Sequence, residues 1–257
     1  MITINALPVF TDNYIWLISH LQHPYVIIVD PGDGDAVMHH CQAHGLVPLA
    51  ILITHHHWDH SRGIITIKQH HDIPVYGPAH EQIDHITHPL VEGDLITFKE
   101  LSLEFKIIDT PGHTAGHICY YGHGTLFCGD TLFAAGCGRL FEGTPTQMQR
   151  SLAKIRALPD DTLIYCAHEY TLDNLNFARI AEPDNQAIIE RQQHTQALRA
   201  NKKPSIPSRL SIEKQTNPFL RWDQTGLIEA ASHYQGTPLK TPAEVFAAVR
   251  QWKDDLD

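Results

Sequence analysis

The sequence contains at positions 54 to 60 the stretch Thr54-His55-His56-His57-Trp58-Asp59-His60. An apolar run typical of a buried strand, Leu49-Ala50-Ile51-Leu52-Ile53, comes directly before it. We therefore expect the histidines and the aspartate in the loop at the carboxyl end of a strand, where sites are usually built. The stretch predicts a sheet core with a polar, chemically active loop at its edge.

The spacing within this loop suits metal ions. His55 and His57 can face one ion while Asp59 and His60 turn toward another, and these imidazole and carboxylate groups suit zinc, iron or manganese. His56 and Trp58 are then expected to point elsewhere. The alternative is a polar surface loop with incidental histidines, so further segments of the same kind are needed to decide.

Three later segments repeat the design of a strand-like run that ends in a potential ligand. They are Ile107-Ile108-Asp109-Thr110-Pro111-Gly112-His113, Leu126-Phe127-Cys128-Gly129-Asp130 and Leu163-Ile164-Tyr165-Cys166-Ala167-His168. Taken alone, His113, Asp130 and His168 would more often be turn or capping residues. Their joint occurrence after the first stretch favours one site. A histidine-rich metal-storage protein would scatter its ligands among the 20 histidines and would not place carboxylates in an ordered pattern with them.

The chain divides into a part rich in strands and a later helical part. Strand-like runs occupy Tyr14 to Ser19, Tyr25 to Asp30, Leu49 to Thr54, Leu103 to Asp109, His117 to Tyr121, Thr125 to Asp130 and Thr162 to Cys166. Helical patterns alternate with them at Asp35 to His44, Ser61 to His71 and Pro145 to Ala157, and after Tyr170 they take over, notably at Asn185 to Lys203 and Thr241 to Leu256. This pattern predicts an α/β or α+β domain over residues 1–168 and a helical domain over residues 169–257.

Two helix starts carry a clear signal. Thr144, Pro145 and Gln147 occupy the N-cap, N1 and N3 positions of one capping box, and Thr241-Pro242-Ala243-Glu244 forms another. We expect helices to begin at both places.

Composition excludes several classes of protein. A formal net charge of -10 without clustered Lys and Arg argues against a nucleic-acid partner. The chain has no apolar run near the roughly 18 residues that suggest a membrane span, and Met1-Ile2-Thr3-Ile4-Asn5 lacks the basic start of a secretory signal. The five cysteines include no Cys-x-x-Cys pair. We expect a cytoplasmic monomer that binds no membrane.

From Asp30 through His168, the order of these residues resembles the metallo-β-lactamase superfamily. The resemblance implies an αββα sandwich and two divalent metal ions. One ion would take His55, His57 and His113, the other Asp59, His60 and His168, and Asp130 would bridge both. Asp30 matches the family's outer-shell carboxylate position, although it could equally only begin the turn at Pro31-Gly32.

Five stretches narrow the resemblance to glyoxalase II, the hydroxyacylglutathione hydrolase family. They are Asp12-Asn13-Tyr14, Gly136-Cys137-Gly138-Arg139-Leu140-Phe141-Glu142-Gly143, His168-Glu169-Tyr170-Thr171, Asn217-Pro218-Phe219-Leu220-Arg221 and Arg250-Gln251-Trp252-Lys253. By this resemblance, Arg250 and Lys253 hold the glycine carboxylate of glutathione. Tyr170 and the backbone or side chain of Arg139 add hydrogen bonds, and Phe141 replaces a substrate-contacting tyrosine of some members. Without the resemblance, Arg250 and Lys253 would be assigned to an ordinary solvated helix face.

The resemblance implies a metal-dependent thioester hydrolase, the second enzyme of methylglyoxal detoxification. The resemblance favours two zinc ions, with iron or manganese as alternatives, and the two ions would lower the pKa of a shared water from ~15.7 toward ~7. Asp59 would ligate and would orient the resulting hydroxide or take up its proton. The products would be lactate and glutathione. The alternative from another class is a mononuclear iron dioxygenase that acts on glutathione persulfide.

Overall fold

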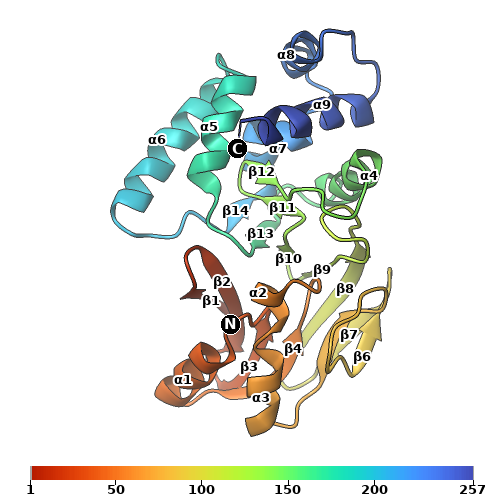
Figure 1. Ribbon diagram of the computed structural model, residues 1–257. Helices are drawn as coiled ribbons and strands as arrows, with labels where there is room; N and C mark the ends of the chain where they lie inside the picture. Colours follow the sequence, from red (N-terminus) through yellow and green to blue (C-terminus); the bar gives the residue numbers. More distant parts are fainter. Residues whose placement is uncertain (1, 257) are drawn as a thin grey trace. The chain divides into compact units, whose positions relative to one another are not determined.

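The computed structural model describes residues 2–256, which form two compact units (Figure 1). The first unit consists of the chain up to Asp109 together with Thr114–Gly129. The second consists of Thr110–His113 and the chain from Asp130 onward. The predicted boundary between residues 168 and 169 divides the chain along its sequence, and it stays a prediction.

The described part of the first unit contains two sheets and the helices that pack on one of them. Its elements are β1 (Ile2–Val9), β2 (Asn13–His20), β3 (His23–Val29), α1 (Gly34–His44), β4 (Val47–Leu52), α2 (Trp58–Ser61), α3 (Ile64–His70), β5 (Val75–Pro78), β6 (His88–Leu90), β7 (Leu95–Phe98), β8 (Leu103–Asp109), β9 (Ile118–Gly122) and β10 (Thr125–Gly129). The strands β1 to β6 follow one another in sequence order across the first sheet. Pairing is antiparallel from β1 to β3 and parallel from β3 to β6. The strands β7 to β10 form an antiparallel meander.

Two helices cover the first sheet. Val37 of α1 and Ile67 of α3 are fully buried in one hydrophobic cluster with Ile28 and Ile51 of the sheet. Burying such side chains is worth roughly 1.5 to 3 kcal/mol each, so this cluster is a main source of stability for the unit. It fixes β3 and β4, and therefore the loops that follow them.

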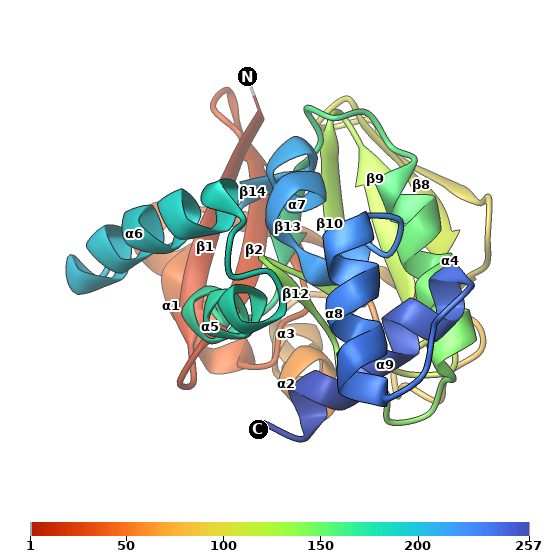
Figure 2. The ribbon, with the colours of Figure 1, turned by 90° about the horizontal axis from the view of Figure 1, so that it is seen from above.

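The second unit is mostly helical. Its elements are β11 (Leu132–Phe133), β12 (Gly136–Cys137), α4 (Pro145–Arg156), β13 (Leu163–Cys166), α5 (Thr171–Ala181), α6 (Gln186–Ala200), β14 (Ser208–Arg209), α7 (Leu210–Thr216), the 3₁₀ helix η1 (Pro218–Leu220), α8 (Thr225–Gln235) and α9 (Pro242–Asp254). Figure 2 shows α8 and α9 side by side, in agreement with their extensive contact. The predicted helical region after Tyr170 is confirmed, with β14 as a two-residue strand inside it.

Both predicted capping boxes are confirmed. The Thr144 hydroxyl accepts the N–H of Gln147 at the start of α4, and the Thr241 hydroxyl accepts the N–H of Glu244 at the start of α9. In each box the side chain at N3 also accepts the N-cap backbone N–H. Two helix starts are therefore explained by local sequence alone.

The helix predicted from Ser61 to His71 is confirmed as α3 over Ile64–His70, but its predicted start is wrong. Ser61 instead ends the separate short helix α2, and the helical run is interrupted at Gly63. The Gly63 N–H donates to the Pro31 carbonyl at 2.8 Å, and a Cβ at Gly63 would stand 2.2 Å from that oxygen. Close backbone approach after β3 thus ends the first helix, which the helical periodicity could not reveal.

None of the helices within residues 2–256 is long and apolar enough to cross a membrane.

Candidate metal centre

The first unit presents four potential ligands on the loop after β4. His55 and His60 are buried, whereas His57 and Asp59 are partly exposed. The short helix α2 begins after His57, and the His60 N–H donates to the His57 carbonyl at 3.0 Å. The His60 ring nevertheless stays near the His55 ring, with centroids 4.1 Å apart. Asp59 Oδ2 lies 3.5 Å from His60 Nε2.

Asp30 braces this loop from the end of β3. Its carboxylate is 4% exposed and accepts the Thr54 N–H at 2.8 Å and the Thr54 hydroxyl at 2.7 Å. Its Oδ2 also lies 3.1 Å from His60 Nδ1. The Asp30 backbone carbonyl separately accepts the Gly32 N–H, so the turn is formed by the backbone. The side chain is thus available to hold Thr54 and His60.

These contacts select the tautomers of two histidines. The Thr54 hydroxyl gives its hydrogen to Asp30, so it accepts a hydrogen from His55 Nδ1 at 3.1 Å. His60 Nδ1 donates to the Asp30 carboxylate. Both rings therefore carry their hydrogen on Nδ1 and offer the Nε2 lone pair, as metal-binding histidines with a supporting acceptor do.

His56 makes a different contact. Its Nδ1 lies 3.0 Å from Oε2 of Glu81, a side chain that is 3% exposed and whose Oε1 accepts the Gly116 N–H. Trp58 is 59% exposed. Neither side chain joins the potential ligands, as the spacing predicts.

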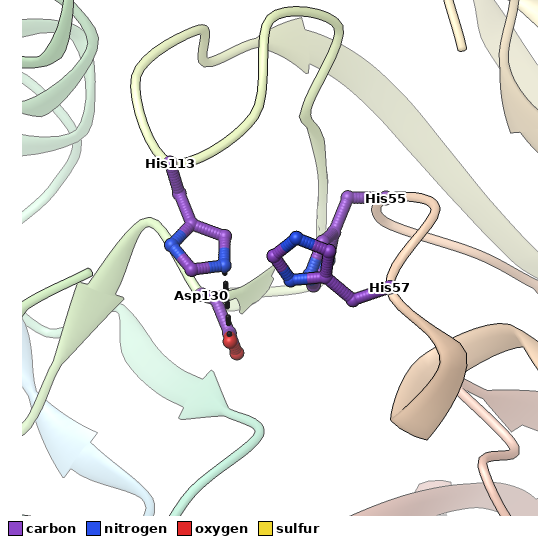
Figure 3. Close-up of side chains that lie close together, drawn as sticks. All are labelled: His55, His57, His113 and Asp130. Atoms are coloured by element: carbon purple, nitrogen blue, oxygen red, sulfur yellow. Dashed lines mark ion pairs between the residues drawn. The ribbon is translucent and has the colours of Figure 1, made fainter. Parts of the chain in front are cut away.

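In the second unit, Asp130 lies between two histidines. Its Oδ2 is 3.4 Å from His113 Nε2 and 3.4 Å from His168 Nε2. Two ligand atoms that share a tetrahedral zinc at about 2.0 to 2.1 Å would stand roughly 3.3 Å apart. The spacing on both sides of Asp130 therefore suits a carboxylate that bridges two ions. Figure 3 draws the His113 and Asp130 pair with a dashed line, and also draws His55 and His57 on their own loop.

The neighbours of these histidines fix their rings. His113 Nδ1 lies 2.8 Å from the Arg139 carbonyl oxygen, which can only accept, so His113 also offers Nε2 to a metal. The Tyr170 ring stacks on His168 with centroids 4.8 Å apart. Phe141 is 62% exposed and its ring lies 5.2 Å from the His113 ring.

The predicted cationic pair on α9 is buried. Arg250 donates to the Cys137 carbonyl at 3.1 Å and to Asp254 at 3.0 Å, and its guanidinium lies 5.0 Å from the Phe219 ring centroid. Lys253 is 8% exposed. An ordinary solvated helix face, the alternative that the sequence left open, is therefore wrong for both residues. Arg139 Nε lies 3.3 Å from Asp254 Oδ1, the same oxygen that accepts a hydrogen bond from Arg250.

Two family models together match nearly the whole chain. The metallo-beta-lactamase superfamily model matches residues 11–168, and the hydroxyacylglutathione hydrolase C-terminus model matches residues 169–256. A hydroxyacylglutathione hydrolase of Nitrosomonas eutropha is 52% identical over 256 residues, covering 100% of both chains. A second, of Aeromonas salmonicida, is 51% identical and covers 99% of both. The chain belongs to the hydroxyacylglutathione hydrolase family.

Solved structures agree with the fold of this family. The BLEG-1 B3 metallo-beta-lactamase matches with a TM-score of 0.64 at 23% identity, covering 85% of this chain and 100% of that one. ETHE1 from Myxococcus xanthus matches with a TM-score of 0.66 at 22% identity, covering 98% of both chains. The predicted metallo-β-lactamase fold with its C-terminal helical region is confirmed.

The donor set of this family member fits a binuclear divalent metal site. The candidate ligands are imidazole and carboxylate groups, and His55, His60 and His113, whose Nδ1 atoms face acceptors, all offer Nε2. Imidazole and carboxylate together suit zinc, iron and manganese.

Cysteine chemistry does not contribute to this site. All five cysteines are buried, and none forms a disulfide. Burial raises the pKa of Cys137 to about 11 and that of Cys166 to about 12, so both remain protonated at neutral pH. A protonated thiol is a poor nucleophile.

Two supporting groups escaped the sequence analysis. The Thr54 hydroxyl orients His55, and the Arg139 carbonyl orients His113. Thr54 could have been assigned, since it lies between a strand end and the first histidine. A backbone carbonyl carries no sequence signal.

Proposed function

We propose that the protein hydrolyses S-(2-hydroxyacyl)glutathione, with S-lactoylglutathione as the usual substrate, to a 2-hydroxy acid and glutathione. The observation that carries this proposal is the match of the helical region, residues 169–256, to the hydroxyacylglutathione hydrolase C-terminus. Full-length relatives that bear this name are about half identical to the chain. Residues 1–168 would form the catalytic domain and residues 169–257 the substrate-binding domain of a cytoplasmic monomer.

The proposed metal ligands divide into two sets that share Asp130. One set is His55, His57 and His113, and the other is Asp59, His60 and His168. The support is the 3.4 Å spacing on either side of Asp130 and the Nε2 lone pairs of the oriented rings. When bound, two divalent ions, zinc or else iron or manganese, would supply Lewis-acid polarisation of the carbonyl and acidify a water.

Asp59 would hold the attacking water. Asn13 Nδ2 donates to Asp59 Oδ2 at 2.9 Å, which fixes the direction of this carboxylate. A fixed carboxylate can orient a water molecule or take its proton. Because the thiolate of glutathione is a good leaving group, no strong general acid is needed.

Glutathione would be bound by the second unit. Arg250 and Lys253 would hold the glycine carboxylate, and Tyr170 and Arg139 would add hydrogen bonds. Support comes from the cationic side chains near α9 and from Tyr170, whose ring stacks on the proposed ligand His168. Phe141 has no hydroxyl to contribute, so its exposed ring would offer apolar contact only.

Hydrolysis of S-lactoylglutathione by purified protein, before and after chelation and with metal analysis, tests the proposal. We expect turnover that chelation abolishes and that added metal restores. A metal-loaded protein without thioesterase activity would contradict the proposal. Oxygen consumption with glutathione persulfide would instead support the iron dioxygenase, which the match of the C-terminal region disfavours.

A further inference from the structure

A short hairpin lies between Asp130, a proposed metal ligand, and Arg139, whose carbonyl orients the proposed ligand His113. The β11–β12 hairpin, Leu132–Cys137, begins two residues after Asp130 and ends two residues before Arg139. Its two strands pair at Leu132 with Cys137 and at Phe133 with Gly136. Strands of two residues cannot hold a hairpin on their own in water, so other contacts must hold it.

The turn of the hairpin is also unfavourable in itself. Ala135 has a φ of 58°, which residues other than glycine rarely adopt. Its N–H donates to Glu213 Oε2 at 2.8 Å, and the Ala134 carbonyl accepts Asn174 Nδ2 at 3.1 Å. Both partners come from the helical region that follows His168.

Asn217 holds the two strands directly. Its Nδ2 lies 3.1 Å from the Phe133 carbonyl and 2.9 Å from the Gly136 carbonyl, which belong to the last pair before the turn. Asn217 Nδ2 also lies 3.1 Å from Glu213 Oε2. Asn217 and Glu213 are both 0% exposed. One buried amide thus joins both strands to one buried carboxylate.

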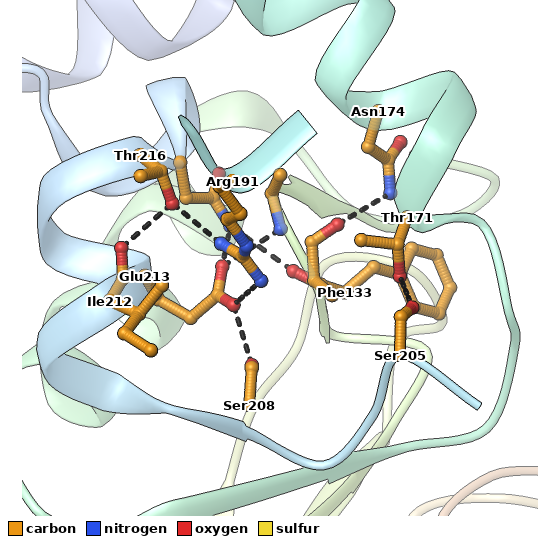
Figure 4. A network of polar contacts seen from close by, with 12 residues as sticks. Phe133, Thr171, Asn174, Arg191, Ser205, Ser208, Ile212, Glu213 and Thr216 are labelled. Carbon is orange, nitrogen blue, oxygen red and sulfur yellow. Dashed lines mark hydrogen bonds and ion pairs between the residues drawn. The ribbon is translucent and has the colours of Figure 1, made fainter. Parts of the chain in front are cut away.

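Glu213 is itself fixed by charge and hydrogen bonds. Arg191 and Ser208 donate to its Oε1 (Figure 4). The Ala135 N–H and Asn217 Nδ2 donate to its Oε2. A buried carboxylate with partners on both oxygens is rigid, and leaving one partner out would cost stability. The position of the hairpin therefore depends on the position of α7, which carries Glu213.

The base of the hairpin adjoins the proposed ligands. The Gly138 N–H donates to the Thr131 carbonyl at 3.2 Å, and a Cβ at Gly138 would stand 2.0 Å from the Asp130 carbonyl oxygen and 3.0 Å from His113 Nδ1. The next residue, Arg139, supplies the carbonyl that orients His113. A shift of the hairpin would therefore move both Asp130 and His113.

We propose that Asn217 and Glu213 are positioning residues of the metal centre: through the β11–β12 hairpin they hold Asp130 and the Arg139 carbonyl in place. This inference rests on the proposed function for its metal ions. It gives the helical region a second task besides binding glutathione. Groups that orient metal ligands typically change metal affinity 10- to 100-fold when they are removed.

Asn217→Ala tests the inference, with zinc affinity measured by competition against a chromophoric chelator. We expect the affinity to fall about tenfold or more. At saturating zinc we expect kcat for S-lactoylglutathione to fall while KM changes little. The matched control is Asn201→Ala, which removes an exposed hydrogen bond to the Ala197 carbonyl at the end of α6 in the same unit. It should keep wild-type zinc affinity.

Asn174→Ala provides the milder variant if Asn217→Ala does not fold, because it removes the donor to Ala134 and leaves Asn217 and Glu213 in place. We expect it to weaken zinc binding severalfold. Folded Asn217→Ala, or folded Asn174→Ala, with wild-type zinc affinity would overturn the inference. Zinc affinity is measured without substrate, so an inactive wild-type protein would contradict the proposed function and leave this outcome readable.

Discussion

At the scale of single residues, the candidate site depends on which acceptor faces Nδ1 of each histidine, because that contact leaves Nε2 available for a metal ion. A hydroxyl, a carboxylate and a backbone carbonyl respectively accept hydrogens from Nδ1 of His55, His60 and His113. Asp30 acts on two of these rings, because it orients Thr54 as well as His60. The Asp30 carboxylate is therefore proposed to support the site by accepting these hydrogen bonds, whereas the turn is formed by the Asp30 backbone.

Asp30→Asn should weaken metal binding. An amide at this position would turn its NH₂ group either toward the Thr54 N–H or toward the Thr54 hydroxyl and His60 Nδ1, all of which donate to the carboxylate. We expect metal affinity to fall about 10- to 100-fold, as measured by chelator competition. Asp33→Asn is the control, because Asp33 only caps α1 and asparagine caps equally well. Equal affinities in the two variants would argue against this role for Asp30.

The residues differ in how far sequence could identify them. His55, His57, Asp59 and His60 were recognisable because four potential ligands lie within six positions after a strand. Glu213 and Asn217 were not assigned a role, because their partners Ala135 and Gly136 lie about eighty positions away and are met through backbone atoms. Neither alanine nor glycine carries a signal for such a contact.

At the scale of elements, side-chain caps explain which helices the sequence predicted well. α1, α4, α6 and α9 have a capping Asp33, Thr144, Asn185 or Thr241, and their predicted starts lie within one residue of the structure. α5, α7 and α8 begin without a side-chain cap and were not resolved as separate helices. The two- to four-residue strands β5 to β7, β11 and β12 are too short for a periodic pattern.

Thr241→Ala should destabilise the protein by about 1 kcal/mol, because α9 loses a capping hydrogen bond to the Glu244 N–H. For a chain of this size we expect the midpoint of thermal unfolding to fall by roughly 2 to 4 °C. Thr237→Ala makes the same chemical change outside the helix and serves as the control. A Thr241→Ala variant that unfolds at the wild-type temperature would contradict the importance of this cap.

The same capping box predicts a pH dependence. Backbone N–H groups of Lys240 and Thr241 donate to Glu244 and hold its pKa below the ordinary value of 4.5. A pKa that is lower in the folded state adds stability above pH 4.5, and that stability is lost as the pH falls through the lowered pKa. Glu244→Gln keeps the acceptor but removes the titration. We expect the stability difference between wild type and Glu244→Gln to shrink below about pH 4.5. A difference that stays constant from pH 7 to pH 3 in denaturant titrations would exclude this effect.

At the scale of the whole molecule, the helical region is expected to recognise glutathione while the metal ligands carry out the reaction. Lys253→Met tests this separation, since methionine retains an apolar stem beside Phe177 but removes the charge. We expect KM for S-lactoylglutathione to rise severalfold with little change in kcat, as for the loss of remote binding. The control substrate is a lactoyl thioester of a small neutral thiol, whose kcat/KM should not change. A similar loss with both substrates would remove Lys253 from glutathione recognition.

Metal binding should also stabilise the chain, because its proposed ligands span positions 55 to 168. An ion that binds only the folded state adds about 2.7 kcal/mol per site at a free concentration 100-fold above its Kd. We therefore expect the unfolding temperature of the chelated protein to rise with added zinc. Two neighbouring substitutions separate ligation from general disturbance of the loop: His57→Gln should reduce this rise, whereas His56→Gln should not, because His56 contacts Glu81 instead. Differential scanning calorimetry of both variants with and without zinc measures the effect, and equal responses would contradict the proposed division of the loop.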